Sequence, residues 1–142
     1  AGTTPVIAAI EGLQLGMSIC YDLRFPHLYR QLALDGAQIL AVPAAFTKVS
    51  GAAHWHILLR ARAIETGCYV IAPAQCGTHS DGRQTYGHAM IISPWGEILC
   101  EADDGDAVVT AQLDIAKITA ARRAIPSLNS NAIIGATRSS GG

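Results

Sequence analysis

Three consecutive segments near the start of the chain have the pattern of a strand, a helix and a second strand. Residues 13–20 alternate loosely between apolar and polar types, which is typical of a strand. Pro26 suits the first turn of a helix, apolar residues then recur at intervals of three and four, and Gly36 suits the C-terminal end. The apolar run at residues 39–42 is closed by Pro43 and indicates a buried strand. This order predicts a βαβ unit and therefore an α/β fold.

The rest of the chain extends this pattern over a single domain. Residues 6–10 are apolar and precede the turn Glu11-Gly12, so they predict a hairpin with residues 13–20. Further elements are predicted from spacing and turn residues: a helix at residues 54–66 ended by Gly67, strands at residues 69–74, 86–93 and 107–113, a polar loop at residues 78–84, a turn at residues 94–96 and a helix from Asp114 through Ile125. We expect residues 1–126 to form the domain. Residues 127–142 lose this periodicity and are expected to form a divergent or flexible tail.

The low charge of the chain limits its partners. Of the 142 residues, only 15% are charged and 50% are hydrophobic, and the formal net charge is -1. No basic surface is therefore expected for nucleic acid or anionic lipid, and no apolar run approaches the roughly 20 residues of a membrane span. We expect a cytosolic protein. So little charge also indicates that part of the surface is buried, either against identical subunits or against a missing part of the same fold.

The cysteines favour neither a disulfide framework nor a metal site. There are four, at positions 20, 68, 76 and 100, and they contain no C-x-x-C pair. No histidine lies at a zinc-ligand offset from them. We therefore expect reduced thiols, and we predict no metal and no cofactor.

One of these cysteines lies at a position suited to nucleophilic chemistry. The segment GMSICYDLRFP places Cys20 where a strand breaks sharply before a helix, which is the arrangement of a nucleophile elbow. Amide N–H groups at the positive end of the helix would favour a thiolate and could donate to an oxyanion. A free cysteine is also a common buried apolar residue. The segment by itself leaves both interpretations open.

Four blocks of the chain resemble the nitrilase, or carbon–nitrogen hydrolase, superfamily. In chain order they are GMSICYDLRFP, GAQILAVPAAFT, AHWHILLRARAIETGCYVIAPAQCG and GRQTYGHAMIISPWGEIL. The sequences of these blocks are most similar to those of the branch that hydrolyses deaminated glutathione. The resemblance implies part of an α-β-β-α sandwich and a Glu-Lys-Cys catalytic set.

The resemblance also implies roles for individual residues. Cys20 would attack an amide carbon to give a thioester and ammonia, which water would then convert to the acid. The backbone N–H of Tyr21 would donate to the oxyanion, and Ala45, Phe46 and Thr47 would line the pocket.

Other residues near these motifs are expected to support the site. Asp22 and Arg24 are predicted to hold the elbow through hydrogen bonds and an ion pair. His54, which opens the predicted helix, is expected to pack and hydrogen-bond near the site. Glu65 follows Arg62 by three residues on one helical face, so an ion pair is favoured over an acid–base role.

The chain departs from the family in one large respect. The general-base Glu and the oxyanion-stabilising Lys of the family precede the cysteine by a long segment, whereas only nineteen residues precede Cys20 here. Glu11 and Lys48 do not stand in the family's motifs. A free thiol is only a few per cent thiolate at neutral pH, so we expect the chain to be a C-terminal half that is a poor catalyst alone.

Three functions remain open from the sequence. The leading one is an amidase half acting on a small linear amide such as deaminated glutathione, completed by an N-terminal half or assembled as a homo-oligomer. The first alternative is a non-catalytic module that keeps the fold and uses its apolar surface to bind a partner or itself. The second is a Cys–His hydrolase that uses a local histidine, which the ordered blocks disfavour.

Overall fold

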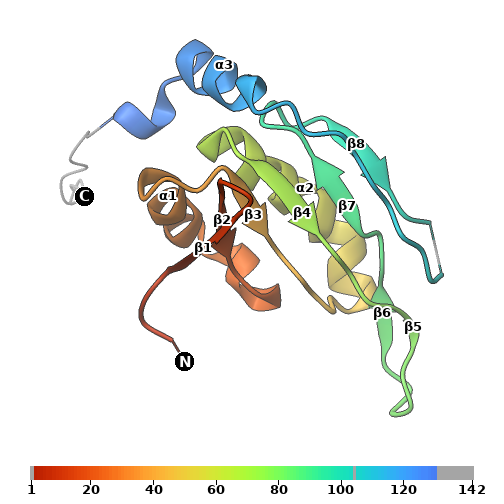
Figure 1. Ribbon diagram of the computed structural model, residues 1–142. Coiled ribbons are helices and arrows are strands. Elements are labelled where there is room, and N and C mark those ends of the chain that lie inside the picture. Colours follow the sequence, from red (N-terminus) through yellow and green to blue (C-terminus); the bar gives the residue numbers. More distant parts are fainter. Residues whose placement is uncertain (1, 104, 131–142) are drawn as a thin grey trace, which may run out of the picture.

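A mixed six-stranded sheet forms the centre of the molecule. The structure is a computed structural model that describes residues 2–103 and 105–130. The strands follow the spatial order β1-β2-β3-β4-β7-β8, as Figure 1 shows. They are β1 (Val6–Ile10), β2 (Leu13–Met17), β3 (Ile39–Ala41), β4 (Tyr69–Ala72), β7 (Met90–Ile92) and β8 (Ile98–Glu101).

The predicted βαβ unit is present and sets the direction of the central strands. β1 and β2 form an antiparallel hairpin, with Glu11 at a φ of 49° in its turn. The helix α1 (Pro26–Leu34) then carries the chain to β3, which lies parallel to β2. β4 pairs parallel with β3, so three neighbouring strands point the same way. The carboxyl ends of β2, β3 and β4 therefore meet at one edge of the sheet.

The helix α2 (Lys48–Thr66) begins six residues before the start predicted at residue 54. Its N-cap is Thr47, whose hydroxyl accepts a hydrogen bond from the Ser50 N–H at 3.4 Å. Gly51 in the first turns disfavours a helix by propensity, but a Cβ at this position would lie 2.2 Å from the Cβ of Tyr86. Close packing against the neighbouring hairpin therefore requires glycine inside the helix.

α1 and α2 cover one face of the sheet and enclose the main core. Large side chains from both helices are fully buried there, among them Tyr29, Leu32, Trp55 and Leu59. A smaller cluster forms on the opposite face, where Ile118 of α3 (Ala116–Ala124) packs against Ile39 and Tyr69. The described chain is thus a helix layer on a sheet layer, with limited cover on the second face.

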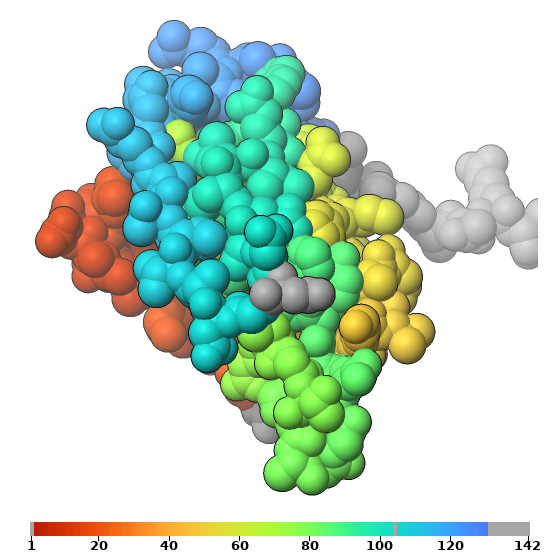
Figure 2. All heavy atoms as spheres, turned by 90° about the vertical axis from the view of Figure 1, so that its right-hand side faces the viewer, coloured from red at the N-terminus to blue at the C-terminus, as the bar shows by residue number. Residues whose placement is uncertain are grey.

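Two strand predictions were wrong. Residues 86–93 do not form one strand, because Gly87 and His88 have φ values of 72° and 57°, which interrupt the extended backbone between β6 (Gln84–Tyr86) and β7. β6 instead pairs with β5 (Cys76–Thr78) in a hairpin that projects from the body (Figure 2). Residues 107–113 form no strand, and β8 is the last strand of the sheet.

The C-terminal part of the described chain packs against α1 and α2. The Asp114 carboxylate accepts from the Ala116 N–H at 3.0 Å, at the start of α3. After α3, the short 3₁₀ helix η2 (Ser127–Asn129) receives Arg30, which donates to the Ser127 and Leu128 carbonyls at 3.0 and 3.3 Å. The described beginning of the predicted tail is therefore packed, while residues 131–142 lie outside the described residues. Within the described ranges, no helix has the length and apolar character needed to cross a bilayer.

Candidate active site

Cys20 lies at a sharp bend directly beyond β2. Its backbone φ is 48°, in the left-handed region that non-glycine residues rarely occupy. Its N–H donates to the Pro43 carbonyl at 2.8 Å. Two residues earlier in the chain, the Ser18 N–H donates to the Ala41 carbonyl at 3.1 Å. The bend turns the chain away from the sheet and leaves the cysteine partly exposed. This is the backbone arrangement expected of a nucleophile elbow.

The segment after Cys20 differs from the prediction in one respect. A five-residue 3₁₀ helix, η1 (Cys20–Arg24), begins at the cysteine, and α1 starts only at Pro26. The N-terminus of a long α-helix therefore does not lie at the thiol, and any assistance from aligned peptide dipoles is limited to the amides of η1. Among the described residues we find no acceptor for the Tyr21 N–H, which keeps it available as a donor.

A cavity of about 480 Å³ opens beside Cys20. It lies where β2, β3 and β4 end, the edge of a parallel arrangement at which ligands commonly bind. Hydrogen bonds from Ala44 to the Pro73 carbonyl at 3.0 Å, and from Gln75 back to Ala44 at 2.9 Å, hold two walls together. The lining residues are Ile19, Cys20, Pro43, Ala44, Ala45, Pro73, Ala74 and Gln75.

Of the three predicted wall residues, only Ala45 lines this cavity. Phe46 is buried in the core, where its ring lies 4.9 Å from that of Trp55. Thr47 caps α2 and forms a bridge with Thr85. Both side chains therefore support the fold behind the cavity and do not line it.

Asp22 and Arg24 hold the elbow differently from the prediction. The Asp22 carboxylate accepts from the Ile19 N–H at 2.9 Å, which closes the turn around Cys20. No ion pair joins Asp22 to Arg24 within the described part of the chain, so that prediction was wrong. The Arg24 guanidinium instead lies over the rings of Phe46 and Tyr21, at 5.1 and 5.5 Å from their centroids.

α2 contacts η1, the segment that carries the elbow. His54 does not open this helix but lies in its second turn, with its Nδ1 at 3.2 Å from the Arg24 guanidinium. The predicted ion pair of Arg62 and Glu65 is present at 2.9 Å. Arg62 also donates twice to the carbonyl of Leu23 in η1, at 3.1 and 2.8 Å. A buried arginine thus fixes the 3₁₀ helix that carries the cysteine.

Comparison with known proteins assigns the chain to a family. The family model for carbon-nitrogen hydrolases matches residues 1–123. The chain belongs to the carbon–nitrogen hydrolase family. The resemblance and the α/β fold class expected from the four sequence blocks are therefore confirmed.

Individual relatives agree with this assignment. The deaminated glutathione amidase of Synechocystis sp. is 54% identical over 114 residues, which cover 80% of this chain and 42% of that protein. Saccharomyces cerevisiae Nit3, a member of branch 10 of the nitrilase superfamily, matches 92% of this chain and 48% of its own, with a TM-score of 0.85 and 34% identity. The chain spans less than half the length of these two proteins.

A third relative carries a modified cysteine. It is a mutant of the amidase from Nesterenkonia sp. AN1, 31% identical, with a TM-score of 0.73 over 87% of this chain and 46% of its own. In that structure the acetamide moiety of fluoroacetamide is covalently added at the active-site cysteine.

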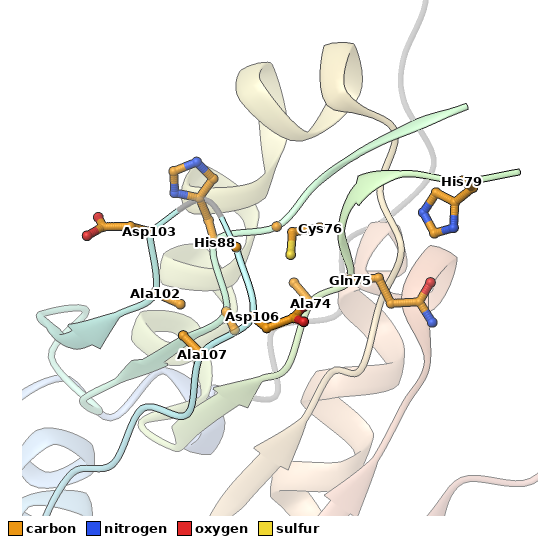
Figure 3. Close-up of a pocket in the computed structure, with 12 residues that line it drawn as sticks. Ala74, Gln75, Cys76, His79, His88, Ala102, Asp103, Asp106 and Ala107 are labelled. Atoms are coloured by element: carbon orange, nitrogen blue, oxygen red, sulfur yellow. The ribbon is translucent and has the colours of Figure 1, made fainter. Parts of the chain in front are cut away.

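This carbon–nitrogen hydrolase chain has a second cavity, of about 350 Å³, whose lining Figure 3 shows. Ala74 and Gln75 line both cavities. The Cys76 sulfur points towards Ala74, and the rings of His79 and His88 lie on opposite sides. Cys76 thus lines the second cavity, whereas Cys68 is fully buried and its thiol has a pKa raised by that burial.

A side-chain cluster beside the second cavity was not predicted from the sequence. His56 of α2 and His88 both donate to one oxygen of Glu101, at 2.8 and 2.6 Å. Burial by itself would raise the pKa of the Glu101 carboxyl, but the hydrogen bonds from both histidines outweigh it and lower the pKa below its usual range. These residues come from three distant segments, so a rule based on local ligand spacing could not detect them.

Proposed function

We propose that this chain is the cysteine-bearing part of an amidase that hydrolyses the carbon–nitrogen bond of a small linear amide. One observation carries the proposal: Cys20 occupies a left-handed bend and opens into a cavity at the carboxyl ends of three parallel strands. The preferred substrate is deaminated glutathione, because several curated relatives at 46–54% identity bear that activity in their names.

The proposed reaction has two covalent steps. The Cys20 sulfur attacks the amide carbonyl carbon while the Tyr21 N–H donates to the developing oxyanion. The C–N bond then breaks, the nitrogen leaves as ammonia after taking up the thiol proton, and a thioester remains. Water attacks the thioester, releases the carboxylic acid and returns the proton to sulfur.

Proton transfer in this scheme needs a group beyond the described cavity. None of the residues that line the Cys20 cavity in the described chain is acidic or a lysine. The family resemblance assigns a Glu and a Lys to the segment that precedes the cysteine, and the relatives are more than twice as long as the matched region. We therefore propose that activity requires this additional segment.

A non-catalytic module is the second candidate. The same lack of an acid–base group at Cys20 favours it, because the fold and the cavity would remain without turnover. Under this alternative, the chain binds a partner or another copy through its apolar surface.

The decisive experiment measures ammonia release from deaminated glutathione. We expect little release by the chain alone and substantial release when a complementary N-terminal half is added. Cys20→Ser should abolish release and Cys100→Ser should preserve it. The absence of release in both mixtures, or full activity of Cys20→Ser, contradicts the amidase and favours the module.

Thiol reactivity separates the elbow from an ordinary cysteine. Iodoacetamide at neutral pH should label Cys20 faster than Cys68, which is buried, and faster than Cys100, which is partly exposed like Cys20 but lies in β8. Peptide mass spectrometry over time would follow all three sites. Equal labelling rates in the folded chain would contradict an accessible nucleophile.

A further inference from the structure

We propose that His56, His88 and Glu101 form a binding site for a divalent transition-metal ion, with Zn²⁺ as the favoured ion. The three side chains offer two imidazole nitrogens and one carboxylate oxygen, and these atoms all lie within 4.8 Å of one another. The site is separate from the Cys20 cavity, because none of the three residues lines it.

The ligand atoms are close to the geometry that zinc requires. His56 Nε2 and His88 Nδ1 lie 2.8 and 2.6 Å from the same Glu101 oxygen. Tetrahedral zinc with ligands at about 2.0–2.1 Å places neighbouring ligand atoms roughly 3.3 Å apart. The two His–Glu pairs would therefore have to separate by less than one ångström, and the two imidazole nitrogens, which lie within 4.8 Å of each other, would have to reach the same spacing. Each of the three side chains is about a third exposed or less.

The surrounding residues already orient both rings. Tyr86 stacks on His88 with the ring centroids 4.2 Å apart, and its ring is nearly perpendicular to that of His56, with the centroids 5.9 Å apart. The Trp55 indole N–H donates to the His88 carbonyl at 2.8 Å. The backbone of the next residue, Ala89, is bonded to Ala102, adjacent to Glu101, at 2.8 Å. The three ligands are therefore held by α2, by the turn before β7 and by the end of β8.

The donor set selects the class of ion. Two imidazoles and one carboxylate suit zinc and its transition-metal neighbours, whereas calcium and magnesium prefer sites made mostly of oxygen. Each neutral imidazole can carry its proton on the nitrogen that does not face Glu101, so binding needs only a change of tautomer. Three protein ligands leave a fourth position for water. Because His88 also lines the second cavity, that position is close to its wall.

Zinc binding to the full 142-residue chain tests the proposal. We expect isothermal titration calorimetry with ZnCl₂, after treatment with a chelator, to give one ion per chain. His56→Ala, His88→Gln and Glu101→Gln should each lower the affinity on the order of tenfold or more. His27→Ala is the matched control, since His27 is exposed and outside the cluster. It should leave the affinity unchanged.

Two further measurements exclude misfolding and binding by thiols. Zn²⁺ should raise the Tm of the wild-type chain but not that of Glu101→Gln, whose circular dichroism should show a folded protein. Co²⁺ should give a visible spectrum without a thiolate charge-transfer band, and Cys76→Ser should not alter that spectrum. The absence of zinc binding, binding retained by the folded Glu101→Gln variant, or a cobalt spectrum abolished by Cys76→Ser would each overturn the proposal.

Discussion

At the scale of single residues, the bend at Cys20 rests on polar groups buried beneath it. The Ser18 hydroxyl donates to the Ala41 carbonyl at 2.8 Å, so the Tyr29 hydroxyl must be the donor in its 2.7 Å bond to Ser18. Burial, the largest influence, raises the pKa of Tyr29 to about 12 from its ordinary 10.0. Folding therefore favours the protonated phenol, and loss of that proton would remove a bond next to the elbow.

The first prediction concerns alkaline unfolding. In the unfolded chain Tyr29 ionises near pH 10, whereas in the folded chain it does so near pH 12. The stabilisation is complete below pH 10 and declines between pH 10 and 12, by roughly 3 kcal/mol at most. Urea unfolding across this range should show a shallower decline for Tyr29→Phe. Tyr21→Phe is the control, since Tyr21 is 64% exposed. Equal declines for wild type and Tyr29→Phe would refute the assignment.

At the scale of elements, α2 positions η1 through one arginine. Arg62 is only 5% exposed, and its two hydrogen bonds to Leu23 are made to a residue with no exposure at all. The Glu65 partner is 38% exposed at its side chain, so the ion pair itself contributes little. The structural effect of Arg62 therefore comes mainly from satisfying a buried carbonyl of the 3₁₀ helix.

The second prediction tests this positioning role. Arg62→Met should lower the free energy of unfolding by about 2–3 kcal/mol, because the Leu23 carbonyl loses both donors. Glu65→Gln should cost less than about 1 kcal/mol. Arg62→Met should also change the alkylation rate of Cys20 in the folded protein, and Glu65→Gln should not. If both variants have the same cost and neither alters Cys20, η1 does not depend on Arg62.

At the scale of the whole molecule, apolar side chains gather near one end of the sheet. β1 is an edge strand (Figure 1), and several large apolar residues of the segment from β1 through the residue after η1 are exposed. Their exposed fractions range from 41% to 64%, and the residues are Val6, Ile10, Met17, Ile19, Tyr21 and Phe25. Several exposed large apolar residues in one segment of the chain are typical of an interface. It supports the expectation that this chain associates with another copy or with a complementary segment.

The third prediction is that the isolated chain self-associates as its concentration rises. Sedimentation velocity should show the weight-average mass increasing, and the pair Val6→Glu and Ile10→Glu on β1 should suppress the increase by charge repulsion and loss of apolar contact. Val108→Glu is the control, because Val108 is a 93% exposed valine outside the sheet. A monomer at every concentration, or equal suppression by Val108→Glu, would contradict this prediction.

The sequence predicted the parts of the fold that depend on neighbouring residues. Pro26 and Gly36 limited the position of α1, and the apolar run before Pro43 identified β3. The break at Cys20 was visible because a strand pattern ends where a helix pattern has not yet begun. The sequence did not predict the true start of α2, because Gly51 disfavours a helix by its propensity. Only the close contact with Tyr86 explains a glycine inside this helix.

By itself, the sequence determined the βαβ order, the family and the position of the bend that carries Cys20, since these depend on local spacing and on motif wording. Only the tertiary structure decided that Ala45 faces the cavity while Phe46 and Thr47 do not, and that His56, His88 and Glu101 meet. The physical reason is that a side chain's surroundings come from residues tens of positions away. Backbone spacing within one segment carries no record of which distant element will pack against it.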